Sequence, residues 1–510
     1  MIVAGEASRT AVHRAGDRVL VIQPDGLRRT GHELEARVAG LARALEQQGL
    51  RGRRVGLRFW NSAAAIEAHL AVEWIGATRV PVDPGAPPAE AAAVFAAAGV
   101  DGVVVDGAHL PDAPPGALLH DEDQPLLAAG RLELTTVAPQ TTALLYPRMA
   151  AHGELMGVPI SYANWVATMD ANVALYRSGA YGLGFDGDER FLTAQQLMHG
   201  TGPVGTFPFL HMGLPQVILR GFDAAQVLEA AQRFRATATF FVPGMVTRLA
   251  QTISELDLPG ASPLRRIIYG GGPFDDADLR YAVEAIGPVL VQVYGRFEGG
   301  WPLAVLGVED HIAIAGGRSR RSGSCGRPIA QTELTVRSIP GRPDGPGELY
   351  VRNAMVVDEF ADPDGWCGLG DLGSLDDDGY LYLEGRLDGM INTGSYHVYP
   401  GEVEEAIAAI PTVRGALVRG EPDPRWGQAV TAYVVPSPEA PEDLLDVVRA
   451  ACEARLARYK IPKRFHLVTS LDAVPTPGAA RAHENGIPYR PRAGSGDPAA
   501  TSTGSSTPPG

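Results

Sequence analysis

DGWCGLGDLGSLDDDGYLYLEGRLDGMINTGSYHVYPGEVEEA, residues 364–406, combines a hairpin signal with a helix start. Asp378 and Gly379 stand between the runs LGSL and YLYLEG, and Asp-Gly is the pair most typical of a tight β-hairpin turn. Pro400 suits the first position of a helix, and Glu402 suits the positive N-terminal end of that helix. The stretch therefore predicts two antiparallel strands followed by a helix.

Polar residues occupy two points of this predicted hairpin. Asp371 follows Gly370 on the first strand, while Arg386 and Asp388 come at the end of the second. A carboxylate can accept hydrogen bonds from both hydroxyls of a ribose, and an arginine fork can donate to the same sugar or to a phosphate. Taken alone, the pattern also fits a hairpin and an amphipathic helix at the edge of a domain.

In order and spacing, the stretch resembles the adenylate-forming superfamily of acyl-CoA synthetases, peptide-synthetase adenylation domains and luciferases. The family pattern is TGD, a turn, GRxDxxI, a glycine pair and PxEVE, and this chain matches it at Gly370–Asp371, Gly385–Asp388, Ile391, Gly394–Ser395 and Pro400–Glu404. The resemblance implies that Asp371 and Arg386 bind the ribose of AMP, with Gly394 also at the nucleotide. It implies that Asp388 is the catalytic hinge, about which a small C-terminal domain turns between two half-reactions.

Composition narrows the class of protein. The chain has 510 residues, 45% of them hydrophobic, a net charge of −15 and three scattered cysteines. Such a length is enough for more than one domain. The acidic balance argues against a nucleic-acid partner, and the cysteines, which form no CxxC, predict neither disulfides nor a zinc site. No apolar run reaches about 18 residues and no apolar signal core opens the chain, so we expect no membrane span and a cytoplasmic location.

Strand and helix patterns alternate over the first part of the chain. Residues 30–48 predict a helix, because Thr30 and Glu33 can form a capping box and Gly49 can end it. Strand-like runs such as RVGLRFW, ATRVPVD and DGVVVD alternate with helical segments, which is the βαβ pattern of a parallel sheet covered by helices. We therefore expect an α/β fold.

The resemblance also divides the chain into domains. It implies a large N-terminal domain at 1–386, made of βαβ subdomains and a β-rich subdomain, and a small mobile α/β domain at 387–490. Residues 491–510 are rich in Ser, Thr, Gly, Pro and Ala, a composition that predicts a disordered tail.

Residues 141–165, TTALLYPRMAAHGELMGVPISYANW, stand where the family has a phosphate loop of the form TSGTTGxPKGVxxSHxN. Such a loop needs small residues, hydroxyls and a cation around the phosphates. Here the cradle hydroxyls are replaced, and Met156 stands at the lysine position. Arg148 and His152 are candidate substitute donors, and the alternative is that the segment no longer binds a triphosphate.

Two further matches concern the acid and the adenine. His199 stands where the family has a histidine beside the acid pocket, and the resemblance implies a catalytic role for it. Gly270, Gly271 and Gly272 follow a predicted strand, where the family's glycines let the chain pass close to adenine. An ordinary tight turn is the alternative interpretation of the triplet.

The sequence YGRFE at 294–298 resembles the family's YGxTE. The resemblance implies that Tyr294 and Gly295 contact adenine, and that Glu298 is a catalytic residue that binds magnesium. Phe297 replaces the threonine that would touch a phosphate.

Lysine is nearly absent from the chain, which has only Lys460 and Lys463. Both lie in the motif YKIPKRF, and we expect them to be structural or surface residues. In the family, a lysine further along bridges the acid carboxylate and the α-phosphate. Its position here is Gly478 or Ala479, neither of which carries a charge.

Three functions fit these residues. The first is an AMP-dependent acid–thiol ligase of the acyl-CoA synthetase type, which activates a carboxylic acid as an acyl-adenylate and passes it to a thiol. The second is an enzyme that only transfers a preformed acyl-adenylate, and the third is a non-catalytic relative that binds a ligand or a partner protein. The resemblance implies ATP or AMP as cofactor, with Mg²⁺ and CoA or another thiol acceptor. It implies a small carboxylic acid or acyl-adenylate, and CoA or a carrier protein, as partners.

Overall fold

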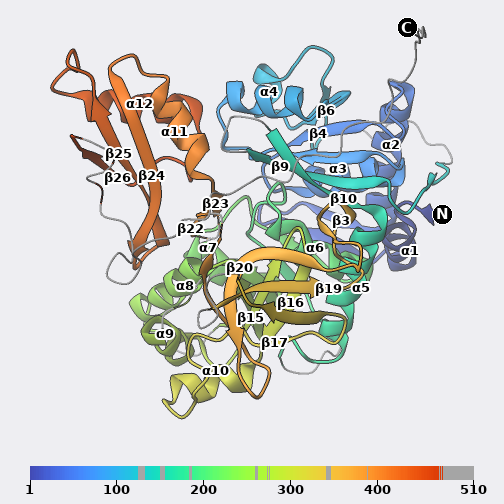
Figure 1. The fold of residues 1–510 in the computed structure, drawn as a ribbon. Coiled ribbons are helices and arrows are strands. Elements are labelled where there is room, and N and C mark those ends of the chain that lie inside the picture. Colours follow the sequence, from blue (N-terminus) through green and yellow to red (C-terminus); the bar gives the residue numbers. More distant parts are fainter. Residues whose placement is uncertain are drawn as a thin grey trace, which may run out of the picture.

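The computed structural model has a large N-terminal domain and a small C-terminal α/β domain, as Figure 1 shows. It describes residues 1–510 except 125–131, 150–154, 183–186, 259–261, 273, 275, 340–345, 388, 395, 470, 472–473 and 475–510. Strand β21 (Leu381–Arg386) is the last element of the large domain, and β22 (Ile391–Thr393) is the first of the small one. The boundary expected at 386/387 lies between them and stays a prediction, as does the tail, which is outside the described residues.

The first large sheet has six strands in the order β10-β9-β5-β4-β6-β7. All neighbouring strands are parallel except β10, which is antiparallel to β9. The strands are β4 (Arg54–Arg58), β5 (Thr78–Pro81), β6 (Gly102–Val105), β7 (Leu118–Leu119), β9 (Thr142–Met149) and β10 (Leu155–Ser161). Helices α3 (Ala63–Trp74) and α4 (Pro88–Ala97) lie between its strands in the sequence, and α2 (Gly31–Gln47) packs against α3. The predicted βαβ pattern is therefore confirmed, and so is the capping box of α2, in which Thr30 and Glu33 bond to each other's backbone.

The second large sheet has nine strands in the order β17-β16-β15-β14-β13-β11-β12-β2-β3. The six strands from β15 to β2 are parallel, and the edge strands are antiparallel to their neighbours. The strands are β2 (Val19–Ile22), β3 (Arg28–Thr30), β11 (Phe191–Thr193), β12 (Gln216–Ile218), β13 (Ala238–Phe241), β14 (Arg266–Gly270), β15 (Leu290–Arg296), β16 (Gly300–Leu306) and β17 (Arg327–Pro328).

Helices link and cover these two sheets. Helix α5 (Tyr162–Arg177) contacts β9 and β10 of the first sheet and β16 of the second. The others in this part are α1 (Glu6–Ala15), α6 (Thr201–His211), α7 (Ala224–Phe234), α8 (Pro243–Glu255), α9 (Asp276–Ile286) and α10 (Val308–Ala315). The short pieces are β1 (Ile2–Val3), which pairs with β8 (Thr136–Val137), and the 3-10 turns at Leu110–Asp112 and Asp358–Phe360.

A four-stranded antiparallel sheet contains the predicted hairpin. Its order is β18 (Glu333–Arg337), β19 (Gly347–Arg352), β20 (Cys367–Leu375) and β21. Asp376 closes the turn between β20 and β21, because its carboxylate accepts hydrogen bonds from the backbone N–H groups of Asp378 and Tyr380. The register places Asp371 directly opposite Arg386. The hairpin predicted from Asp-Gly is confirmed.

The small domain has its own sheet and core. Strands β22, β23 (Tyr396–Val398), β24 (Val413–Asp423), β25 (Gly427–Pro436) and β26 (Arg464–Leu467) form the sheet. Helices α11 (Pro400–Ala408) and α12 (Leu444–Arg455) pack with it around a separate cluster of buried apolar side chains. The helix predicted from Pro400 is confirmed as α11.

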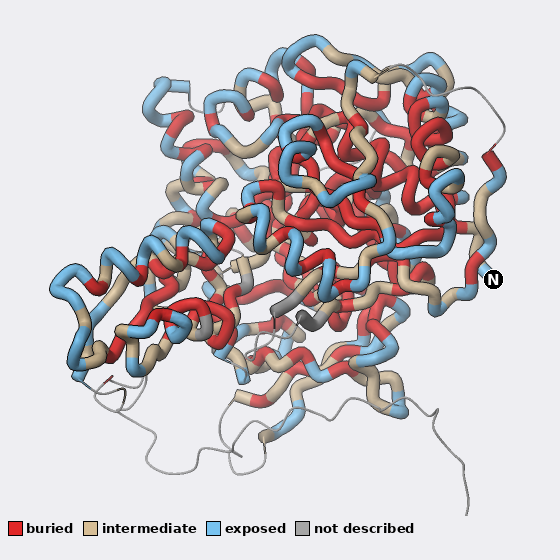
Figure 2. Tube along the Cα trace, turned by 90° about the horizontal axis from the view of Figure 1, so that it is seen from above, coloured by how far each residue is buried: buried red, intermediate tan, exposed pale blue. Residues whose placement is uncertain are grey.

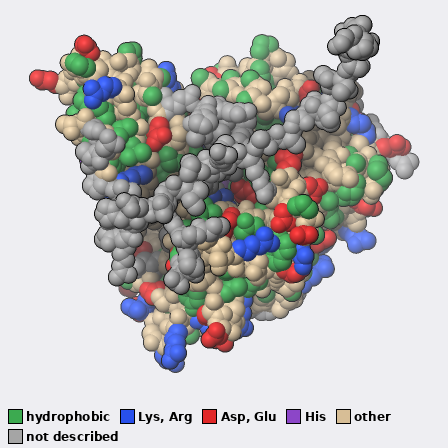
Figure 3. All heavy atoms as spheres, in the orientation of Figure 1, with side chains coloured by type: hydrophobic (Ala, Val, Ile, Leu, Met, Phe, Trp, Pro, Cys, Tyr) green, Lys and Arg blue, Asp and Glu red, His purple; other side chains and the backbone are tan. Residues whose placement is uncertain are grey.

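Buried residues run through the centre of the large domain, while exposed ones lie along its outer loops and helices (Figure 2). On the coloured part of the face in Figure 3, basic side chains are interspersed with acidic ones and do not gather in a stripe. Among the described residues, no helix combines the length and the apolar character that crossing a membrane requires.

Candidate functional site

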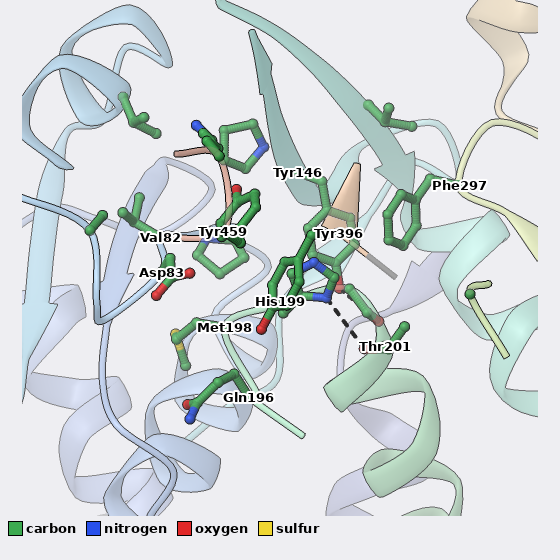
Figure 4. A pocket seen from close by; sticks show the side chains of 18 of the residues that line it. Val82, Asp83, Tyr146, Gln196, Met198, His199, Thr201, Phe297, Tyr396 and Tyr459 are labelled. Atoms are coloured by element: carbon green, nitrogen blue, oxygen red, sulfur yellow. Dashed lines mark hydrogen bonds between the residues drawn. The ribbon is translucent and has the colours of Figure 1, made fainter. Parts of the chain in front are cut away.

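A cavity of about 180 Å³ lies where the two domains meet. The large domain lines it from the end of β5 through α4, from β9 and β10, and from the segments around His199 and Phe297. The small domain contributes Tyr396, Tyr399, Tyr459 and their neighbours. Figure 4 shows aromatic side chains from both domains facing one another across this space.

The three residues expected at the nucleotide's ribose and adenine meet in one cluster. The Tyr294 hydroxyl donates to Asp371 Oδ2 over 2.6 Å, and Arg386 donates to the other oxygen of the same carboxylate. Asp371 is 6% exposed and Tyr294 is 7% exposed. In this arrangement they do not line the cavity, whereas Gly295 and Arg296, which follow Tyr294, do. Their roles at a nucleotide stay predictions.

Arg296 is a site residue that the sequence interpretation missed. Its Nη2 lies 3.3 Å from Glu298 Oε1, and its Nε lies 3.9 Å from Asp371 Oδ2. Burial alone would lower the pKa of this guanidinium, but Glu298 and then Asp371 outweigh that effect, and the pKa is raised. The signal was an arginine at the variable position of YGxTE, two residues before the expected magnesium ligand.

His199 lies in the cavity wall, as expected for a residue beside an acid pocket. Its ring centroid is 4.9 Å from that of Tyr396, and its Nδ1 is 3.3 Å from the Thr201 hydroxyl (Figure 4). Burial lowers the pKa of His199, with Asp83 opposing this more weakly. The imidazole is therefore neutral at neutral pH and can accept or donate a hydrogen bond.

Phe297, at the threonine position of YGxTE, forms part of the cavity wall. Its ring stacks on Tyr146 at 4.6 Å between centroids, and a Cβ built on Gly200 would overlap it at 1.8 Å. Figure 4 shows both rings at the same side of the cavity. The substitution replaces a donor to phosphate by an apolar wall, which suits an aromatic or aliphatic ligand group.

The glycines of the site include two that adopt backbone conformations with positive φ. Gly270 ends β14, and Gly271, at φ +86°, turns the chain beside the cavity before Gly272. The side-chain amide of Asn392, from the small domain, donates to the Gly271 carbonyl over 2.6 Å. Gly394 has φ +58°, and its N–H donates to the Trp426 carbonyl within the small domain. The glycine turn therefore contacts the small domain.

Both lysines of the chain are already engaged. Lys460 Nζ lies 2.6 Å from Glu90 Oε1 of α4 in the large domain, and it also donates to Glu402 of α11 in the small domain. Lys460 is 7% exposed, so of the two alternatives expected for it, a structural or a surface residue, the structure has the structural one, because these two carboxylates pair with its charge inside the domain interface. Lys463 donates to the backbone carbonyls of Arg458 and Ile461.

Several expected site positions lie outside the described residues: the hinge Asp388, His152 in the phosphate-loop segment, and Gly478 with Ala479. Around the loop itself, β9 and β10 form an antiparallel pair in which Gly157 faces Pro147. Within the described part of the chain, no group of three or more His, Cys, Asp or Glu side chains is placed to bind a metal ion. Glu298 contacts Arg296, so the described residues do not fit Mg²⁺ at this position.

Two domains that close over a cavity, with the hairpin pair Asp371–Arg386 beside it, define the class of adenylate-forming enzymes. Comparison with protein families agrees. Residues 8–360 match the model of the AMP-binding enzyme, and residues 402–476 match that of the AMP-binding enzyme C-terminal domain. The chain belongs to the AMP-binding enzyme family.

The chain is similar to acid–CoA ligases along most of its length. It is 30% identical to feruloyl-CoA synthase from Amycolatopsis sp., over 92% of this chain and 95% of that one. The solved structure of the amide bond synthetase McbA from Marinactinospora thermotolerans matches at TM-score 0.80 and 30% identity, covering 92% of this chain and 97% of McbA. A malonyl-CoA ligase in ternary complex with methylmalonyl-CoA and AMP matches at TM-score 0.74 and 26% identity, over 91% and 99%.

Other matches are shorter. Against a fatty-acid–CoA ligase and two 2-succinylbenzoate–CoA ligases, the chain spans only 54 to 61% of the relative's length. Relatives of this chain thus join acids to CoA, and one of them is bound to AMP and a CoA thioester. The activity and substrates of this chain are proposals.

Proposed function

We propose that this chain binds an acyl-adenylate in the cavity and transfers its acyl group to a thiol such as CoA, with little or no formation of the adenylate from ATP. The observation that supports this most directly is that both lysines of the chain already have hydrogen-bond or ion-pair partners. The whole chain has two: Lys460, which lines the cavity, is paired with Glu90 and Glu402, and Lys463 donates to two backbone carbonyls. Lys460 would have to leave two buried carboxylates to act as the cation that adenylation needs between the carboxylate and the α-phosphate, and Lys463 is not among the residues that line the cavity.

The chain keeps more of the residues expected to bind an acyl-adenylate than of those expected to bind a triphosphate. Asp371 and Arg386 are paired next to Arg296 of the cavity wall, where they would serve as a ribose acceptor and donor, and the glycine turn at Gly271 lines the cavity. The apolar wall of Phe297 and Tyr146 can pack against the acyl group. In the transfer step, the thiol sulfur bonds to the acyl carbon, the bond from that carbon to the phosphate oxygen breaks, and AMP leaves with the electron pair while the thiol proton passes to solvent.

The test is a transfer assay with a synthetic benzoyl-adenylate, chosen because the cavity wall is aromatic. With CoA present, we expect the protein to convert it to benzoyl-CoA and AMP in equal amounts, faster than a buffer control. The same protein given benzoate, ATP and CoA should produce little thioester. Failure to accelerate the transfer would contradict the proposal and leave a non-catalytic binding role.

A divergent ATP-dependent ligase is the second candidate, because one observation favours it: Arg296 lines the cavity and carries a positive charge that would replace that of the lysine. Comparable yields of benzoyl-CoA from benzoate with ATP and from benzoyl-adenylate would favour this candidate.

We expect AMP to bind at least as tightly as ATP, and Asp371→Asn to weaken the binding of AMP. A hydrogen bond to a charged acceptor contributes about 1.5–3 kcal/mol, which is roughly 10- to 150-fold in Kd. Because both oxygens of Asp371 already accept, a ribose must share or displace the contacts from Tyr294 or Arg386. Isothermal titration calorimetry measures the change.

The matched control is Asp377→Asn, since Asp377 is exposed on the turn of the same hairpin. We expect this control to bind AMP like the unmodified protein. ATP binding much more tightly than AMP, or an unchanged Kd for AMP in Asp371→Asn, would contradict the prediction.

A further inference from the structure

Two buried carboxylates of the site share one arginine. Arg296 ends β15, and its guanidinium lies between Glu298, two residues further on, and Asp371 of β20, at 3.3 Å and 3.9 Å. The exposed fractions of these residues are 6% for Arg296, 8% for Glu298 and 6% for Asp371. Removing an ion from water costs several kcal/mol unless it is paired, so the three charges depend on one another.

The guanidinium has N–H donors that no strong acceptor occupies. An arginine has five N–H donors. Here Nη2 donates to Glu298, Nη1 contacts the sulfur of Met390 at 4.0 Å, and Nε faces Asp371 Oδ2 at 3.9 Å without a hydrogen bond. Sulfur is a weak acceptor, and a buried donor without a partner is costly. Because Arg296 lines the cavity, an anionic oxygen bound there can accept from this guanidinium.

The same arrangement disfavours a divalent cation. Glu298 and Asp371 carry two negative charges, which Arg296 and Arg386 already balance with two positive ones. A magnesium ion would be placed against guanidinium groups in a site shielded from water, where like charges repel strongly. At nucleotide sites Mg²⁺ is usually bound by one or two carboxylates together with phosphate oxygens, and here the carboxylate of Glu298 is already paired with Arg296.

We propose that Arg296 takes the place of the divalent cation in this protein and makes its phosphate site independent of metal. The inference rests on the proposed function, in which the cavity binds an adenylate. A guanidinium supplies one fixed positive charge and a planar fork of donors, which matches the single negative charge of an acyl-adenylate phosphate. A triphosphate carries several negative charges and would be left largely unneutralised. Arg296 therefore favours the binding of an acyl-adenylate or a nucleoside monophosphate over the binding of a nucleoside triphosphate.

The first test measures AMP binding by calorimetry in excess EDTA and in excess Mg²⁺. We expect the two Kd values to agree within about twofold. Arg296→Met should weaken AMP binding about 10- to 100-fold, since a charge-assisted hydrogen bond is lost. Arg352→Met is the matched control, because it removes an arginine from an exposed Arg–Glu pair with Glu333 in the same domain, and we expect its AMP affinity to be unchanged. AMP binding that requires Mg²⁺ would overturn the inference.

The second test needs no nucleotide and uses Mn²⁺ with electron paramagnetic resonance. We expect the unmodified protein to leave Mn²⁺ free in solution. Arg296→Met, which takes the cation away from Glu298, should bind Mn²⁺, and the double variant Arg296→Met/Glu298→Gln should lose that binding again. Mn²⁺ bound by the unmodified protein and released in Glu298→Gln would refute the inference.

The two tests separate the two proposals. An unmodified protein that binds no AMP contradicts the proposed function, while the Mn²⁺ result still decides whether Arg296 occupies the cation position. Arg296→Lys covers the case in which Arg296→Met does not fold, because it keeps the charge. We expect it to remain unable to bind Mn²⁺ and to bind AMP more weakly than the unmodified protein, since lysine lacks the fork. Mn²⁺ binding by Arg296→Lys would count against the inference.

Discussion

Acid-dependent ATP–pyrophosphate exchange should be at background for the unmodified protein with simple aliphatic and aromatic acids. The expected deficit is on the order of 100- to 1000-fold relative to an adenylate-forming enzyme that keeps its lysine, because that is the typical effect of removing one preorganised charge from a transition state. Met156 stands at the position of the family's phosphate-loop lysine. Gly478 or Ala479 stands at the position of the family's catalytic lysine. A radiolabelled pyrophosphate assay with ATP, Mg²⁺ and each acid measures the rate.

Restoring one charge should not restore the reaction. Gly478→Lys and Ala479→Lys are each expected to stay at background, because the hydroxyl residues of the family's phosphate loop are also replaced, at positions 148–152. The assay has an internal control, since the same preparation is expected to transfer benzoyl from its adenylate to CoA. Robust exchange by the unmodified protein would show a divergent ligase instead. Loss of that exchange in Arg148→Ala or in Arg296→Met would then identify the substitute cation.

Lys460→Met should destabilise the protein by about 3–5 kcal/mol, the usual effect of leaving buried charges without their partner. Lys460 joins Glu90 of the large domain to Glu402 of the small one, and the side chains of both glutamates are at most 13% exposed. Without the lysine, two carboxylates face each other across the domain interface. We expect a lower midpoint in urea unfolding, and a larger radius of gyration in small-angle X-ray scattering because the domains separate.

The chain's other lysine provides the control for this experiment. Lys463→Met removes an ammonium that donates to two backbone carbonyls and is partly exposed, so we expect a loss below about 1.5 kcal/mol. Combining Lys460→Met with Glu402→Gln should recover part of the stability by removing one of the two facing charges. Equal effects of the two single lysine substitutions would show that the bridge between the domains contributes nothing specific.

Local signals in the sequence were sufficient for much of the fold. The capping box of α2, the Asp-Gly turn of the β20–β21 hairpin and the start of α11 at Pro400 were all predicted where the structure has them. Each depends on residues a few positions apart, whose hydrogen bonds form within one turn or hairpin. The pairing of Asp371 with Arg386 was not predicted, because it depends on a shift of the hairpin register between Leu372 and Gly373 that the turn residues do not indicate.

Contacts between distant parts of the chain were beyond such signals. Lys460 and Glu90 are 370 positions apart, and the sequence assigned Lys460 to a structural or surface position without indicating its partner. The approach of Tyr396 to His199 likewise depends on how the small domain lies against the large one. Propensity and periodicity carry no information on such a docking, which depends on the shape and charge of two finished surfaces.

The sequence by itself determined the family, the α/β class and the residues that could meet a nucleotide, because these follow from ordered motifs and short-range geometry. Only the tertiary structure decided which of those residues are already engaged. Arg296 stood in the sequence as the variable residue of a motif, and packing of β15 against β20 made it the shared partner of Glu298 and Asp371. A buried charge must be paired, and the fold determines which groups are close enough to pair with it.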